Sequence, residues 1–225
     1  VGSLGSPGLN AATPIIIEPG RPIGDIYVPE FKGINADGTW NVTMDKSEFI
    51  VAGNGLPDFS LNFINTFKYN NWDLNFLLRG VFGHSLVNAT RTFYEQPNVA
   101  PTYNVLASSF GAETFGLTIN ESRLSTLYVE KADFIRLDNI TLGLNLAGFG
   151  ESLGIESSRL YLSGQNLFTI SGYKGVDPEV RYTDNGQEGN GDFITDIDDP
   201  LIPGIDRRNT WFTTKTVVLG LNVKF

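Results

Sequence analysis

Residues 211–225 read WFTTKTVVLGLNVKF, and this stretch decides the fold class. From residue 217 onward, apolar side chains alternate with small or polar ones, which is the two-residue period of a β-strand. The apolar side of the strand consists of Val217, Leu219, Leu221, Val223 and Phe225. A strand of a soluble sandwich fits this pattern. A strand of an outer-membrane barrel, with lipid on one side and a wet lumen on the other, fits it as well.

A stronger signal is residues 59–82, FSLNFINTFKYNNWDLNFLLRGVF. Apolar and polar side chains alternate in both halves, and Asn70-Asn71 between them suits a tight turn with positive φ. Large apolar side chains crowd one side of each half, which is unusual for a soluble surface. The pattern predicts an antiparallel hairpin with one apolar face and one mostly polar face.

Two more strands are predicted at residues 134–146 and 159–170, joined by a short connector at 148–158. Residues 84–130 and 171–210 are long and irregular. Loops of this length are uncommon inside a compact soluble domain. Long external loops that alternate with short turns are typical of outer-membrane barrels. We therefore expect residues 59–225 to hold transmembrane strands with long extracellular loops.

The sequence predicts loops and weak strands at the N-terminal end of the chain and one long strand at the C-terminal end. Residues 1–58 contain loops and weakly predicted strands of the barrel, including a hairpin around the turn at 35–38 and a loop at 51–58. At the other end, residues 212–225 would form a strand of about 14 residues, which is long enough to span a bilayer when tilted.

Composition excludes several classes of protein. The chain has 225 residues, a net charge of −9 and no cysteine. The acidic balance argues against nucleic acid as a partner, because nucleic-acid binding needs a basic surface. Without cysteine there are no disulfides and no thiolate metal sites. No apolar run is long enough for a transmembrane helix, whereas barrel strands need only about 9–11 residues.

Several motifs together resemble a known family. They are IRLDNITLGLNL (135–146), RLYLSGQNLFTISGYKGVDPEV (159–180) and GIDRRNTWFTTKTVVLGLNVKF (204–225), with GNGLPDF (53–59) and NATR (88–91) upstream. These runs are similar to the C-terminal end of SusC-like (SusC/RagA family) TonB-dependent transporters, over residues 20–225. One departure is the segment 209–213, which lacks the prolines that the family has before its last strand.

The resemblance implies an all-β fold, namely the C-terminal part of a 22-stranded transmembrane β-barrel. It also implies a non-enzymatic role in a TonB-dependent importer of oligosaccharides or peptides, which works with a SusD-like lipoprotein. The outer membrane of a Gram-negative, Bacteroidetes-like bacterium is the expected location. We expect the plug domain, through which the TonB complex acts, and the earlier strands to be supplied by residues outside this sequence or by another chain.

The polar side of the predicted strands carries the candidate lumen-lining residues Asn75, Arg79, Asn139, Thr141 and Asn145. Under the resemblance they would line the wall around the plug. We expect them to contact the plug or water in preference to substrate.

Other candidate sites have weaker signals. Asp192, Asp196 and Asp198 lie in an acidic loop whose carboxylates suit a structural Ca²⁺, although a solvated external loop is the simpler interpretation. No other cofactor is expected. His84 is the only histidine, and no serine or acid is spaced to form a triad with it. Phe225 resembles the terminal aromatic signal that the barrel-assembly machinery reads.

Two alternatives to the importer remain. The first is a soluble β-sandwich module that binds carbohydrate through its long loops. The second is a self-contained small outer-membrane barrel of eight strands, which needs residues 1–58 to supply strands next to the last one. The apolar faces at 72–82 and 217–225 argue against the soluble module, and the weak patterns of residues 1–58 argue against the small barrel.

Overall fold

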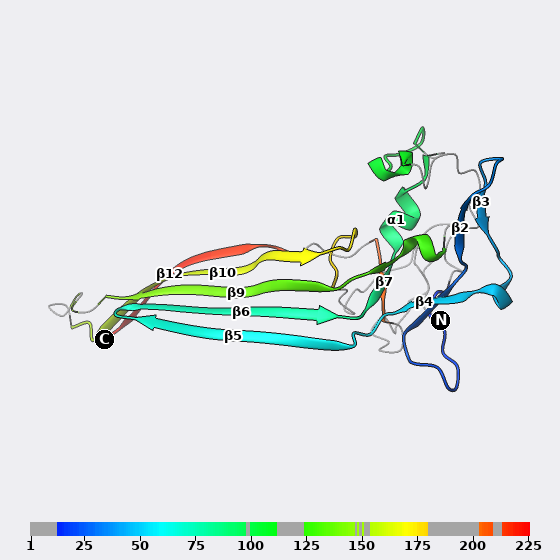
Figure 1. Cartoon of the computed structure of the whole chain (residues 1–225). Coiled ribbons are helices and arrows are strands. Elements are labelled where there is room, and N and C mark those ends of the chain that lie inside the picture. Colours follow the sequence, from blue (N-terminus) through cyan, green and yellow to red (C-terminus); the bar gives the residue numbers. More distant parts are fainter. Residues whose placement is uncertain are drawn as a thin grey trace, which may run out of the picture. The chain divides into compact units, whose positions relative to one another are not determined.

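The computed structural model describes residues 13–97, 100–111, 124–146, 148, 150, 154–179, 203–208 and 213–225. The chain forms two compact units, whose labelled elements can be followed in Figure 1. Unit 1 contains residues 1–58, 83–133 and 172–212. Unit 2 contains residues 59–82, 134–171 and 213–225.

Unit 2 is one antiparallel sheet with the strand order β12-β10-β9-β6-β5. Its strands are β5 (Phe59–Tyr69), β6 (Trp72–Phe82), β9 (Phe134–Asn145), β10 (Ser157–Ser171) and β12 (Thr216–Lys224). Asn70 has a φ of 51° in the turn between β5 and β6, as the predicted hairpin requires. The five strands are the long ribbons that lie side by side in Figure 1.

The register of the sheet separates apolar from polar side chains. One row of paired residues crosses all five strands and is apolar throughout: Phe67, Leu74, Leu142, Leu162 and Leu219. An adjacent row on the opposite face contains Thr66, Asn75, Thr141, Ser163 and Val218. Because the side-chain period is two, a slip of one residue would exchange these faces. The alternation predicted for the strands is therefore confirmed in their pairing.

Aromatic pairs reinforce the β5–β6 hairpin on its apolar face. Phe59 stacks on Phe82 with ring centroids 5.1 Å apart, and Phe76 contacts both Phe63 (5.8 Å) and Phe67 (6.2 Å). Such cross-strand pairs contribute roughly 0.2–1 kcal/mol each. Phe59, Phe63 and Phe67 remain more than half exposed, so these contacts do not remove the apolar face from the surroundings.

The last strand is shorter than predicted. β12 begins at Thr216, whose partner on β10 is Gln165. The β10 ladder becomes irregular between Gln165 and Phe168, where Asn166 has a φ of 51°. This irregularity interrupts the strand geometry that a further residue pair would need.

Unit 1 contains small sheets and short helices. A two-stranded sheet joins β1 (Asp25–Val28) to β4 (Ile50–Asn54), and another joins β2 (Phe31–Ile34) to β3 (Trp40–Val42). The third sheet has the order β11 (Ile205–Asp206), β7 (Ser85–Asn88) and β8 (Val129–Lys131). The described helices are α1 (Ala89–Tyr94) and the 3₁₀ turns η1 (Lys46–Glu48), η3 (Ala107–Phe110) and η4 (Thr126–Tyr128).

A buried core brings segments of unit 1 together from distant parts of the sequence. Its residues are Ile15, Ile26, Val28, Val87, Ala89, Leu124 and Ile205. The described parts of 84–130 and 171–210 are therefore packed structure instead of open loops. No helix in the described part of the chain is both long enough and apolar enough to cross a membrane.

The expected cut after residue 58 coincides with the start of unit 2, but residues 83–133 and 172–212 belong to unit 1 as well. Residues 1–58 were expected to add strands to the barrel, but β1–β4 pair with one another and not with the five-stranded sheet. The loop predicted at 51–58 is also wrong over its first half, which is strand β4. The partner strand of β4 is β1, which lies far upstream in the sequence. The local sequence around β4 therefore does not reveal the pairing.

The face assignment leads to a first prediction. Leu219→Arg should destabilise the membrane-inserted protein by about 2–4 kcal/mol, because it places a charge on the outward apolar face. Val218→Arg, the same change one residue earlier, lies on the polar face and should have little effect. The measurement is the urea midpoint of unfolding of the intact protein from lipid vesicles. Equal midpoints for the two variants would contradict the assignment.

Candidate functional site

The polar face of unit 2 is the first candidate site, and its side chains form cross-strand contacts. Asn75 Nδ2 donates to Thr66 Oγ1 at 2.7 Å. The hydroxyls of Thr141 and Ser163 are 2.9 Å apart. These bonds link neighbouring strands on a face that is mostly polar, as expected for a wetted wall.

The remaining predicted lumen residues also have neighbours on this face or at its end. Asn139 Oδ1 accepts a long bond of 3.4 Å from Thr141 Oγ1. Asn145 lies at the end with the short turn, where its backbone N donates to Asn71 O at 2.8 Å. Arg79 forms an ion pair with Asp138, with Nε 2.6 Å from Oδ2. The structure thus spreads the five predicted residues along one wall, and their role as a lining remains a prediction.

A bulge adds residues that the alternation missed. The β6–β9 register shifts between Leu77 and Leu78, which leaves Asp138 as the extra residue of β9. A bulge re-aims the side chains next to it. Asp138 therefore reaches Arg79, although strict alternation from Ile140 would place it on the apolar face.

Beyond the bulge, two arginines lie against one ring. The guanidinium carbons of Arg79 and Arg136 are 5.4 Å and 5.0 Å from the centroid of Phe134. Arg136 is almost fully buried and donates from Nε to Thr169 Oγ1 at 3.0 Å. Cation–π contacts of this kind gain strength when they are shielded from water. Opposing charges in the run FIRLDN were the only signal in the sequence for this cluster.

Two glycines on the polar face make room for large side chains, one of which belongs to a second ion pair. Arg159 on β10 donates to Asp73 on β6 through Nε (3.0 Å) and Nη2 (2.5 Å), although β9 lies between the two strands. It crosses β9 at Gly143, where a Cβ atom would collide with its guanidinium. The ring of Tyr161 likewise covers Gly220 on β12. Sequence reasoning missed Asp73 and Arg159, since the pair joins non-adjacent strands.

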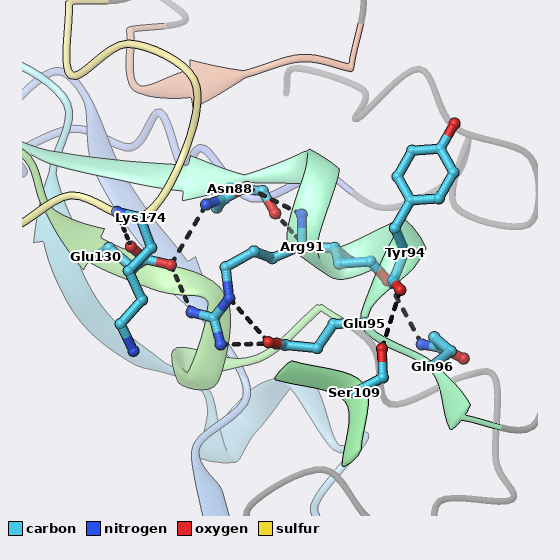
Figure 2. Close-up of polar contacts among 9 residues, drawn as sticks. Asn88, Arg91, Tyr94, Glu95, Gln96, Ser109, Glu130 and Lys174 are labelled. Carbon is cyan, nitrogen blue, oxygen red and sulfur yellow. Dashed lines mark hydrogen bonds and ion pairs between the residues drawn. The ribbon is translucent and has the colours of Figure 1, made fainter. Parts of the chain in front are cut away.

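Unit 1 contains the second candidate site, a buried ion cluster at α1 (Figure 2). Arg91 lies between two carboxylates, with Nη2 2.6 Å from Glu95 Oε2 and Nη1 2.5 Å from Glu130 Oε1. Its guanidinium carbon is also 5.4 Å from the ring centroid of Tyr128. Burial alone would lower the pKa of Arg91, but the hydrogen bonds that it donates to Glu130 and Glu95 raise it above its usual value.

The ion cluster ties separate segments of unit 1 together. Asn88 caps α1 by accepting from Arg91 N at 2.9 Å, and Glu130 accepts from the backbone N of Lys174 at 2.9 Å. Nearby, Tyr173 donates its hydroxyl to Asp206 at 2.6 Å. Burial, followed by the charge of Asp206, raises the pKa of Tyr173 far above its usual value. A neutral tyrosine and a paired arginine suit a fixed structural junction.

The other sequence candidates have different outcomes. His84 is buried, and its Nε2 lies 2.9 Å from Pro178 O, which fits a structural histidine. The proposed Ca²⁺ ligands Asp192, Asp196 and Asp198 lie outside the described residues, so that site stays a prediction. Within the described ranges, no group of three or more His, Cys, Asp or Glu side chains is arranged to hold a metal ion. Phe225 is 79% exposed, and its role in assembly also stays a prediction.

The ion cluster gives a second prediction. Arg91→Met leaves two buried carboxylates without their partner and should destabilise unit 1 by about 3–5 kcal/mol. Arg21 forms a comparable pair with Glu18 on the surface, so Arg21→Met should cost less than about 1 kcal/mol. Hydrogen exchange of the α1 amides in the intact protein measures both. Similar protection in the two variants would show that the cluster does not hold unit 1 together.

The close approach of Arg159 to Gly143 gives a third prediction. Gly143→Ala should push Arg159 away from Asp73 and destabilise the sheet by about 1 kcal/mol. Adding Arg159→Met to this variant should cost little more, because the ion pair is already lost. Gly172→Ala is the control, since its Cβ would meet no atom within 4 Å. Thermal midpoints are compared for the parent, Gly143→Ala, Arg159→Met, the double variant and the control, and additive effects of the two changes would contradict the close approach.

No protein-family model matches the sequence. The TonB-dependent receptor P3 of Formosa agariphila is 27% identical over 239 aligned residues, which cover 93% of this chain and 23% of that receptor. The TonB-dependent receptor SusC of Bacteroides thetaiotaomicron is 30% identical over 175 residues, which cover 73% of this chain and 16% of SusC. This chain therefore spans less than a quarter of the length of these two relatives.

A solved structure gives the same result for the fold. The RagAB peptide importer in its closed-closed state matches with a TM-score of 0.65 and 20% identity, over 95% of this chain and 25% of the matched chain. The described residues do not close a barrel by themselves. By sequence and by fold, this chain belongs to the SusC-like TonB-dependent receptors of the outer membrane and corresponds to part of their β-barrel.

Proposed function

We propose that this chain contributes barrel wall and external loops to a TonB-dependent nutrient importer. The imported substrate is an oligosaccharide or a peptide. A SusD-like lipoprotein works with the importer at its extracellular mouth, and the TonB complex drives uptake through a plug domain. The chain itself provides a wall against lipid, a wet inner surface and the structured segments between strands.

The observation that carries this proposal is the two-faced sheet of unit 2. Its outward row keeps large apolar side chains exposed, such as Leu219 at 70% and Phe67 at 54%. A soluble protein rarely exposes a continuous apolar surface of this kind. Lipid on that side removes the cost of exposure, while the opposite face holds ion pairs and amide bonds that suit water or a plug.

The edges of the sheet support a larger barrel. Within the described residues, neither β5 nor β12 has a partner strand along its outer edge. Hydrocarbon does not hydrogen-bond to exposed backbone groups, so an open edge is unstable there. Further strands from the rest of the transporter would cover both edges.

The two alternatives fit the structure less well. A soluble β-sandwich would need a second sheet over the apolar face, and the described residues of unit 1 form only small sheets of two or three strands. A self-contained small barrel would need strands from residues 1–58 beside β12. The described strands β1–β4 pair only with one another.

Assembly involves two further partners in this proposal. The outward face contacts the lipid bilayer, and Phe225 at the end of β12 is recognised by the barrel-assembly machinery. Phe225→Ala should then lower the amount of inserted receptor without changing the uptake per inserted molecule.

The test uses the intact receptor in its host. A strain without the receptor should lose growth on particular oligosaccharides or on short peptides as sole carbon source, and the restored gene should recover it. Inactivating TonB should abolish the same growth. The receptor purified through an affinity tag should require detergent and bring a lipoprotein with it. A receptor that is monodisperse without detergent, or uptake that is independent of TonB, would overturn the proposal.

A further inference from the structure

A short segment of unit 1 is attached to the three-stranded sheet β11-β7-β8 by polar contacts. It consists of residues 172–179, which follow the end of β10, and we call it the strap. These eight residues are all described, and they form neither helix nor strand. Three contacts attach the strap to the sheet, and each involves a residue on or next to a different strand.

The first half of the strap is attached to two carboxylates. The hydroxyl of Tyr173 donates to Oδ2 of Asp206 on β11 at 2.6 Å. The backbone N of Lys174 donates to Oε2 of Glu130 on β8 at 2.9 Å, and Figure 2 shows this bond beside the contact of Glu130 with Arg91. Hydrogen bonds to an ionised carboxylate are stronger than bonds between neutral groups. These two bonds therefore attach the start of the strap firmly but without apolar packing.

The second half of the strap is attached at His84. This residue lies directly before β7, and its Nε2 is 2.9 Å from the carbonyl oxygen of Pro178. Asp177 Oδ1 accepts a bond from the backbone N of Glu179 at 2.9 Å, which closes a local turn at this end. Asp177 and Pro178 are buried, so the strap contacts unit 1 at both of its ends.

The buried core of unit 1 does not include the strap. Among the described residues, the larger hydrophobic cluster contains Val87 from β7 and Ile205 from β11, and the smaller one is formed around Trp40 and Tyr128. Neither cluster contains a residue of the strap. Segments with few buried apolar contacts open locally at a low cost in free energy, whereas core strands open only with the whole unit. The contacts of the strap can therefore break while the core stays closed.

Two further features suit a segment that leaves the sheet and returns. Glu130 keeps its ion pair with Arg91 when Lys174 moves away, so the ion cluster survives the loss of the strap. Gly172 is exposed at the end of β10, and a Cβ atom there would meet no other atom within 4 Å. Glycine accepts large changes of backbone conformation at little steric cost. Gly172 can therefore act as the hinge.

The second glycine of the strap has the opposite environment. A Cβ atom at Gly175 would lie 2.3 Å from Cε1 of Tyr173. The tyrosine ring thus lies against the Gly175 backbone, and in this position its hydroxyl reaches Asp206. The two glycines give a matched pair for substitution, because only one of them contacts the ring that attaches the strap.

We propose that the strap is a two-state element, which opens and closes as one piece on the sheet β11-β7-β8 while the core of unit 1 stays folded. The inference concerns unit 1 alone. It goes beyond the function proposed above, because it holds whatever the importer carries. The contacts at Asp206, Glu130 and His84 define the closed state, and all three are broken in the open state.

The experiment is hydrogen exchange of the intact receptor in detergent, resolved to single amides. Lys174 and Glu179 report on the two ends of the strap. Val87 reports on the core, since its backbone N donates to Gly204 O at 2.8 Å. In the parent protein the two strap amides should exchange at least about a hundredfold faster than the Val87 amide. Equal rates would show that unit 1 opens only as a whole and would overturn the proposal.

Two variants test whether the strap moves as one piece. Tyr173→Phe removes a contact at the first end and should speed exchange at both Lys174 and Glu179 by about tenfold, with Val87 unchanged. His84→Leu removes the contact at the other end and should have the same effect on both strap amides. If each variant speeds only the amide at its own end, the contacts act independently and the proposal is wrong.

The two glycines provide the matched control. Gly175→Ala should displace the Tyr173 ring and speed exchange of both strap amides by about tenfold. Gly172→Ala should leave these rates unchanged or slow them, because alanine restricts the conformations of the open strap. Equal rates in the two alanine variants would contradict the proposal. If His84→Leu unfolds unit 1, which fast exchange at Val87 would reveal, Tyr173→Phe and the glycine pair decide.

Discussion

The constraint on which unit 2 depends is the pairing of five strands in one register. The row through Leu142 is apolar on all five strands, and the row through Thr141 is polar on four of them, with Val218 on β12 as the exception. A single shifted strand would turn charged groups such as Lys68 and Asp73 toward the apolar side. Tight turns and cross-strand aromatic pairs fix this register locally. The ion pairs of the polar face then act across strands that are already aligned.

Unit 1 is organised differently, around a conventional buried core and one buried cation. Arg91 satisfies two carboxylates and also lies against Tyr128, so its side chain joins α1 to the segment at Glu130. Buried ion pairs are weak evidence for overall stability, since desolvation offsets much of their attraction. They do restrict how segments can be arranged. This restriction fixes the position of α1 within unit 1.

The hairpin β5–β6, the faces of β9 and β12, and those of β10 as far as Gly164 could be predicted because alternation is a local property of the sequence. The bulge at Asp138 could not, since the extra residue reverses the alternation only when β6 is paired beside it. The fold of unit 1 could not be predicted from the sequence either. Phe31 N donates to Thr126 Oγ1 across 95 positions of sequence, and no local pattern contains that information. The predicted lumen residues lie along one face of unit 2, whereas the Arg91 cluster could not be predicted, because its members come from separate segments of the chain.

The composition of unit 1 from three separate stretches of chain affects the order of folding. β7 and β11 pair in parallel through Val87 and Ile205, with strands of the large sheet between them in the sequence. Contacts of such long sequence separation form slowly, because a long loop must close before they stabilise anything. Strand hairpins such as β5–β6 can form early, whereas the core of unit 1 must wait for its last stretch. Until that stretch is present, core residues such as Val87 stay exposed to water, so unit 1 cannot be completed before most of unit 2 has been synthesised.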